Sequence, residues 1–200
     1  MLRYIGDYMD KILVKDLSKK FDNQIVFSSL SFSIPYKEMT AIVGPSGSGK
    51  TTLLRILSGL DKDYEGEIKE DKKLKKSFIF QEDRLLKYIS PIENILIVNE
   101  KINRKDLEND LNRLNLNNID DKSISELSGG MKRRIALLRA FLFEFDIIFL
   151  DEPFKGLDEE NKDRAISYVK DKAMDKTLIL VTHDMGEIEK LDIKNIIYLT

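Results

Sequence analysis

Residues 44–51, GPSGSGKT, fit the GxxxxGK[ST] pattern of a phosphate-binding loop. Glycines let successive backbone N–H groups point at phosphate oxygens, because no Cβ atom blocks the approach. A helix that follows the loop directs its positive N-terminal end at the same anion. The predicted nucleotide-binding residues of this segment are Gly44, Pro45, Ser46, Gly47, Ser48, Gly49, Lys50, Thr51 and Thr52. Lys50 would place its charge at the β- and γ-phosphates, and the Thr51 hydroxyl would ligate Mg²⁺.

A second group of reactive residues comes directly after an apolar run at 147–150. The acids Asp151 and Glu152 follow that run, at the expected carboxyl end of a strand, where ligands sit in open α/β sheets. The first carboxylate could hold Mg²⁺, and the second could orient or deprotonate an attacking water. Together with the phosphate-binding loop, the acid pair predicts an ATPase or GTPase.

Strands and helices must alternate along the chain to place these two motifs at one edge of a sheet. Apolar periodicity predicts a helix at 52–60 that turns Leu53, Leu54 and Leu60 inward, mostly helical structure over 82–140 with Asn103 as an N-cap, and another helix within 155–173. The expected strands are two at 12–34, divided by a turn-like stretch at 19–24, and others at 39–43, 66–68, 78–81, 146–150, 178–181 and 196–199. This alternation favours an α/β fold whose mostly parallel sheet is covered on both faces.

Composition excludes several classes of protein. The 200 residues include 33 Lys and Arg against 35 Asp and Glu, so no basic field indicates a nucleic-acid partner. Cysteine is absent and His183 is the only histidine, which rules out disulfides, thiolate metal sites and a two-histidine site. We find no membrane span or signal peptide and expect a cytoplasmic protein. Because the patterned sequence begins after Met9, we expect residues 1–8 to be a frayed or mis-annotated extension.

A third motif narrows the family. The sequence LSGGM at 127–131 closely resembles the LSGGQ signature of the ABC ATPases. Other family elements follow in order: Gln81 resembles the Q-loop glutamine, residues 154–158 resemble the D-loop, and His183 resembles the switch histidine. Phe21 stands where the family keeps an aromatic residue that stacks on adenine, although a lone aromatic can also be a packing residue.

The resemblance implies a P-loop NTPase core with a mostly parallel sheet, an N-terminal antiparallel β portion and an inserted helical sub-domain. Residues 1–200 would form one ABC ATPase domain, with the core at 11–81 and 141–200 and the helical sub-domain at about 82–140. Some family members continue into terminal helices or a regulatory domain. Because the sequence ends soon after the last expected strand, we expect reduced stability of the isolated subunit.

The resemblance also implies a composite ATP site with Mg²⁺. In ABC ATPases the phosphate-binding loop of one protomer faces the signature of another, so this chain should form a dimer, with a second identical copy as the expected partner. Glu152 would be the general base, His183 the γ-phosphate sensor, and Gln81, with Thr51 and Asp151, a ligand of Mg²⁺. The residues expected to act across the dimer interface are Ser128, Gly129, Gly130 and Asp158.

Two departures from the common pattern point to a subgroup. Met131 in the signature and the sequence FQEDRLL at 80–86 resemble the nitrate, sulfonate and taurine importers, whereas 120–126 lacks the TEVGERG-like segment of exporters. The resemblance therefore implies a transport ATPase held on the inner face of the cell membrane by a permease, with a solute-binding protein as an indirect partner. We expect the segment 84–95, which includes Leu86, to form part of a groove for a permease helix, although some of its apolar residues must belong to the core. Lys155 replaces the usual small residue of the D-loop.

The alternatives are ABC ATPases without a permease. DNA-repair relatives insert a long coiled coil between the Q-loop and the signature, and the short interval between Gln81 and Leu127 leaves no room for one. Ribosome-associated relatives carry two ATPase units in one chain, and this sequence carries one set of motifs. An assembly ATPase, such as those of iron–sulfur systems, stays open because it would show the same motifs.

Overall fold

The computed structural model describes residues 10–22, 24–71, 74–119 and 122–200. The expected extension at 1–8 lies outside these residues, as do Asp120 and Asp121 of the segment compared with exporters. Over the described ranges, no helix combines the length and apolar character needed to cross a membrane.

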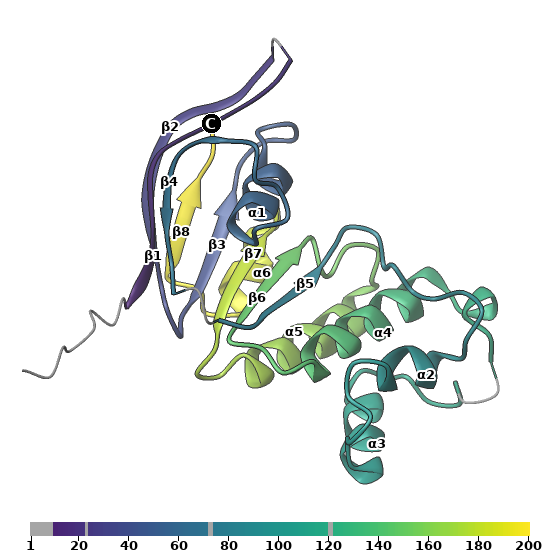
Figure 1. Ribbon diagram of the computed structural model, residues 1–200. Coiled ribbons are helices and arrows are strands. Elements are labelled where there is room, and N and C mark those ends of the chain that lie inside the picture. Colours follow the sequence, from purple (N-terminus) through teal and green to yellow (C-terminus); the bar gives the residue numbers. More distant parts are fainter. Residues whose placement is uncertain (1–9, 23, 72–73, 120–121) are drawn as a thin grey trace, which may run out of the picture.

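A five-stranded parallel sheet forms the centre of the molecule (Figure 1). Its side chains alternate between two hydrophobic clusters: Ile147 and Phe149 face one, Ile148 and Leu150 the other. Such near-continuous apolar strands are typical of parallel sheets buried on both faces. In order across the sheet, the strands are β5 (Lys76–Ile79), β6 (Ile147–Asp151), β7 (Thr177–Val181), β3 (Met39–Val43) and β8 (Asn195–Tyr198).

One face of this sheet is covered by helix α1 (Lys50–Leu57) and by an antiparallel sheet. The antiparallel sheet has the order β2-β1-β4, with strands β1 (Lys11–Phe21), β2 (Gln24–Pro35) and β4 (Glu65–Lys69). Ile12, Leu17 and Ile34 of this sheet are fully buried against the central sheet and α1. Figure 1 shows the β1–β2 hairpin extending past the end of the parallel sheet.

Helices cover the opposite face. The apolar sides of α4 and α5 pack on the central sheet through residues such as Ile135 and Val169. Figure 1 shows α2 and α3 beyond α4, away from the antiparallel sheet. The elements on this side are α2 (Pro91–Leu96), α3 (Arg104–Arg113), the 3-10 turn η1 (Ile124–Glu126), α4 (Gly129–Leu142), α5 (Glu159–Lys172) and α6 (Met185–Lys190).

The predicted α/β class with its mostly parallel sheet and N-terminal antiparallel portion is confirmed. The predicted N-cap of α3 is also confirmed, because the Asn103 side chain accepts a hydrogen bond of 2.8 Å from the Lys105 N–H. The expected strand at 39–43 has the observed bounds of β3. Other strand predictions are displaced by one or two residues, as for β5, which ends at Ile79 rather than at residue 81.

The predicted turn-like stretch at 19–24 is too wide, although Asp22 does lie in a turn. Strand β1 continues to Phe21, and Lys19 is only 4% exposed within it. Its ammonium group pairs with Asp61 at 3.2 Å and Asp63 at 3.1 Å. A buried lysine needs such partners, and these carboxylates lie some 40 residues away in sequence, so the local pattern of polar residues suggested a turn.

The predicted helix at 52–60 is also misplaced, because α1 begins at Lys50 and ends at Leu57. Gly59 has φ +81° and ends the helix in a Schellman motif, in which the Leu60 N–H donates to the Arg55 carbonyl at 2.9 Å. Leu60 therefore lies past the helix and is 52% exposed rather than turned inward.

The prediction of mostly helical structure over 82–140 is too broad. The described residues from Glu82 to Ile89 form no helix, and α2 begins only at Pro91. Its Ser90 cap and the proline at its first position set that start. The segment before α2 is held instead by Asn94, whose side chain bonds both the N–H and the carbonyl of Leu86.

Candidate functional site

A cavity of about 650 Å³ lies where the phosphate-binding loop meets the carboxyl end of β6. It brings together most of the residues predicted from the sequence: Phe21, Gly44, Pro45, Ser46, Gly47, Gly49, Lys50, Thr51, Thr52, Gln81, Glu152 and His183. Gln24, Val26, Lys155 and Val181, which were not predicted, complete its lining. Six predicted residues do not line the cavity: Ser48, Ser128, Gly129, Gly130, Asp151 and Asp158.

The loop takes its shape from glycines at two positions. Gly47 and Gly49 have φ of +84° and +88°, which L-residues with side chains rarely adopt. Gly49 also precedes α1 directly, and a Cβ atom there would lie 2.5 Å from a Val26 methyl group. The loop therefore opens toward the positive end of α1, as an anion-binding loop requires.

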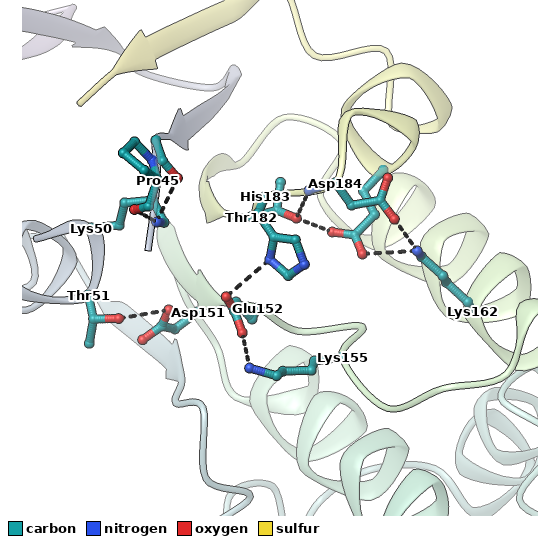
Figure 2. Close-up of polar contacts among 12 residues, drawn as sticks. Pro45, Lys50, Thr51, Asp151, Glu152, Lys155, Lys162, Thr182, His183 and Asp184 are labelled. Carbon is teal, nitrogen blue, oxygen red and sulfur yellow. Dashed lines mark hydrogen bonds and ion pairs between the residues drawn. The ribbon is translucent and has the colours of Figure 1, made fainter. Parts of the chain in front are cut away.

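Lys50 lies across its own loop. Its Nζ donates to the carbonyl oxygens of Gly44 at 2.8 Å and Pro45 at 2.7 Å (Figure 2). These two carbonyls are neutral acceptors, and a phosphate oxygen would be a stronger, charged one. The ammonium group is thus held at the cavity wall, with a charge available to an anion.

Two side chains whose oxygen atoms could ligate a metal ion lie close together beside the loop. The Thr51 hydroxyl donates to Asp151 Oδ1 at 3.2 Å, and Gln81 lines the same cavity. Burial raises the pKa of Asp151, opposed by the Thr51 hydrogen bond. Hydroxyl, carboxylate and amide oxygens are the ligands Mg²⁺ takes in sites that phosphates complete. These side chains therefore fit an ion shared with phosphate. Among the described residues, no group of three or more acidic or histidine side chains could hold a metal ion.

Glu152 is held from both sides. Its Oε1 lies 3.2 Å from His183 Nδ1 and its Oε2 2.7 Å from Lys155 Nζ (Figure 2). Partial burial raises the pKa of Glu152, but Lys155 and then His183 outweigh that effect and leave it below the ordinary value. The backbone of Glu152 is left-handed, with φ +47°, and its N–H donates to the Val181 carbonyl at 2.9 Å.

The turn that carries His183 is anchored by its neighbours. Thr182 donates through its hydroxyl to Glu187 at 2.6 Å and accepts from the Asp184 N–H at 3.1 Å. Asp184 caps α6 by accepting from the Gly186 N–H, and Lys162 of α5 pairs with both Asp184 and Glu187 (Figure 2). This network fixes the backbone beside the exposed imidazole of His183.

Phe21 lies at the end of β1 and is 52% exposed at the cavity. Lys19 Nζ lies 4.7 Å from the centre of its ring, a cation–π distance. An exposed aromatic side chain beside a phosphate-binding loop can stack on a nucleotide base.

The signature residues form a separate surface. Ser128 caps α4 by accepting from the Met131 N–H at 3.2 Å, and Asp158 caps α5 by accepting from the Asn161 N–H at 2.9 Å. Backbone and side-chain hydrogen bonds from Asn161 lower the pKa of Asp158. A Cβ atom on Gly130 would lie 3.4 Å from Leu157, so the signature packs beside the D-loop segment. One chain thus places its signature outside its own nucleotide cavity.

Sequence reasoning missed the role of two basic residues. Lys155 stood out only as a departure from the D-loop pattern, and its contact with Glu152 depends on how the chain turns after β6. No local sequence signal identified Arg133, because its hydrogen-bond partners lie on segments that are far away in sequence.

Comparison with known proteins gives one family. The model of the family described as "ABC transporter" matches residues 27–155. An aliphatic sulfonates import ATP-binding protein SsuB of Bacillus licheniformis is 37% identical over 81% of this chain and 68% of its own length. A spermidine/putrescine import ATP-binding protein PotA of Mycoplasma mycoides is 32% identical over 87% of this chain and 54% of its own length.

A solved structure shares the fold. It is the ATP-binding cassette MJ0796, a dimer in a post-hydrolysis state bound to ADP and Pi. The TM-score is 0.79 and the sequence identity 27%, and the match covers 94% of each chain.

Proposed function

The chain belongs to the ABC transporter family and is an ATP hydrolase of it, and from this premise we propose that it powers a membrane importer. The cavity carries the proposal, because the phosphate-binding loop, Gln81, Glu152 and His183 line it together. The similarity to import ATP-binding proteins supports the transport role.

ATP would bind with its phosphates on the loop and its base on Phe21. The loop N–H groups and Lys50 hold the phosphates, since both present positive charge to the cavity wall. Thr51, Asp151 and Gln81 would hold Mg²⁺, which neutralises developing charge on the phosphoryl oxygens when bound. Glu152 would take a proton from, or orient, the attacking water, and His183 would contact the γ-phosphate.

The second half of the site would come from another copy of this chain. Ser128, Gly129 and Gly130 start α4, where free N–H groups can receive a phosphate. They lie outside the chain's own cavity, so a two-fold dimer is the arrangement that sets them against a bound nucleotide. Asp158 would lie between the two sites. The dimeric state of the similar cassette supports this arrangement.

A permease would hold the dimer on the inner face of the cell membrane. We assign its contact to the segment that follows Gln81 in the helical sub-domain, at about 82–140. There Leu86 is 48% exposed and Tyr88 fully exposed, beside a cavity of about 570 Å³ lined in part by Arg84, Leu85 and Lys132. Exposed apolar side chains next to a hollow are suited to receiving a helix.

The transported solute is selected elsewhere in this proposal. Relatives of similar identity are named for sulfonates, which are anionic, and for spermidine and putrescine, which are cationic. The ATPase site itself contacts only nucleotide. A small anionic or organic solute, delivered to the permease by a solute-binding protein, therefore stays the proposed cargo class.

The test is the solution mass of Glu152→Gln with and without Mg-ATP. This variant keeps the shape of the side chain and loses the carboxylate, so ATP should stay bound and hold the dimer. We expect a monomer without nucleotide and a dimer with it. The matched control is Lys50→Ala, Glu152→Gln, which should stay monomeric because it loses the phosphate contact. A Glu152→Gln monomer that binds ATP would overturn the homodimer.

A further inference from the structure

One buried guanidinium connects the two strand ends that carry the hydrolytic residues. Arg133 is 4% exposed and lies one turn into α4. It donates only to the ends of two adjacent strands and to one carboxylate. Burial lowers the pKa of Arg133, and Asp83 opposes that effect. An arginine stays charged in proteins, so the group is a fixed, fully engaged cation.

Toward β6, Arg133 bonds three successive carbonyl oxygens. Its Nη2 donates to Asp151 at 2.9 Å and to Glu152 at 2.7 Å, and its Nε donates to Pro153 at 2.9 Å. Glu152 has the left-handed φ noted above. A residue keeps such a backbone conformation only where its surroundings hold it in place. Arg133 holds the Glu152 carbonyl, and the hydrogen bond to Val181 holds the Glu152 N–H.

Toward β5, the same guanidinium donates hydrogen bonds to the segment that leads to the cavity beside Leu86. Its Nη1 donates to the Phe80 carbonyl at 2.6 Å, to the Gln81 carbonyl at 3.3 Å and to Asp83 Oδ1 at 3.3 Å. Strands β5 and β6 are paired in parallel, so their ends lie side by side. Arg133 therefore spans both ends and ties them to α4, the helix that Ser128 caps.

We propose that Arg133 is a positioning residue for ATP hydrolysis, which holds the backbones of Glu152 and Gln81 in register with each other and with the signature helix. This inference rests on the proposed roles of those two residues. Arg133 does not line the cavity, so it acts through the residues that touch the reactants. A shift of about 1 Å in a reacting group can cost roughly 100-fold in rate.

The test separates binding from catalysis. In Arg133→Gln and Arg133→Lys we expect kcat to fall roughly 10–100-fold, while the Kd for ATP changes less than about twofold. The control is Arg139→Gln in the same helix: Arg139 donates to the carbonyls of Asp83 and Arg84 and to nothing in the segment after β6. It should keep kcat within about threefold.

Three results would overturn the proposal: an unchanged kcat in a folded Arg133 variant, a parallel loss of binding and kcat, or failure of both variants to fold, which would make Arg133 a folding requirement. Wild type and Glu152→Gln are measured in parallel. If wild type and Glu152→Gln hydrolyse ATP at the same rate, the proposed role of Glu152 is refuted. This comparison therefore separates a failure of the proposed function from a failure of the inference about Arg133.

Discussion

Lys155 Nζ lies 2.7 Å from Glu152 Oε2, so a lysine of the segment after β6 pairs with the carboxylate that would activate water. The ammonium group is 64% exposed at the cavity wall, whereas the Glu152 side chain is 13% exposed. A carboxylate paired with a cation is a weaker base. The pair therefore holds the Glu152 carboxylate and makes it a weaker base.

Removal of the Lys155 cation should make the Glu152 carboxylate a stronger base. We expect Lys155→Met to raise basal ATP turnover roughly threefold at saturating ATP, because the carboxylate accepts a proton more readily. Lys155→Arg should keep the wild-type rate, since it preserves the charge. Steady-state phosphate release measures the effect, with the exposed Lys105→Met on α3 as the control. A slower Lys155→Met enzyme would mean that Lys155 assists hydrolysis instead.

The charge of Lys50 should matter more for binding than that of any surface lysine. Lys50→Ala removes the cation that now lies 2.7–2.8 Å from two loop carbonyls. Loss of a charged hydrogen bond costs about 2–3 kcal/mol, so ATP affinity should fall roughly 30–150-fold. Calorimetry with ATP measures the change, and Lys105→Ala is the control. Undiminished affinity would remove Lys50 from the site.

Mixing two inactive variants should restore hydrolysis if the site is shared between protomers. Lys50→Ala disables one half of the composite site and Ser128→Arg the other. Mixed dimers keep one intact pair, so an equal mixture should recover up to about a quarter of wild-type turnover. Phosphate release from the mixture and from each variant alone measures this. A mixture as inactive as each variant alone would contradict a shared site whose two copies in the dimer work independently.

Leu86 should be needed for transport and not for hydrolysis. Leu86→Glu places a charge on the exposed apolar segment next to the cavity after β5. We expect uptake by the assembled transporter to fall at least 10-fold, because a buried unpaired charge disfavours docking. Basal ATP turnover of the free subunit should stay unchanged. The control is Leu60→Glu, which places a charge at a similarly exposed leucine outside this segment. An equal loss of uptake in Leu60→Glu, or a loss of hydrolysis in Leu86→Glu, would contradict the prediction.

The hydrogen-bond network beside His183, which includes Asp184, should make the stability of the protein depend on pH in the acid range. The hydrogen bond from Lys162 is the largest cause that lowers the pKa of Asp184 below 3.8. A lowered folded pKa stabilises the protein above the unfolded value and loses that stabilisation as the pH falls through the folded value. Asp184→Asn keeps a capping side chain and cannot ionise.

We therefore expect Asp184→Asn to be less stable by up to about 1 kcal/mol at pH 7, with the difference shrinking over the pH range below about 4. Urea unfolding across that range measures it. Asp163→Asn, which breaks an exposed pair with Lys190, should change stability less. A constant difference at every pH would show that ionisation of Asp184 is not involved.

Features encoded by neighbouring residues were predictable. The phosphate-binding loop, the acid pair after β6 and the Asn103 cap each depend on a few consecutive residues whose local geometry carries the chemistry. Helix and strand existence followed from apolar periodicity for the same reason. Boundaries were less predictable, since single residues set them: the backbone conformation of Gly59 ends α1, and the side-chain cap of Ser90 starts α2.

Contacts across long separations in sequence were not predictable. Lys19 was predicted to lie in a turn because its carboxylate partners are far away in sequence, and no local pattern identified the carbonyl partners of Arg133. The sequence by itself determined the family, the α/β class and the nucleotide-binding loop. Only the tertiary structure decided which cations are buried, that Lys155 pairs with Glu152, and that the signature residues lie outside the lining of the chain's own cavity. Those outcomes depend on which strand ends the packed sheet places side by side, and no stretch of local sequence contains that information.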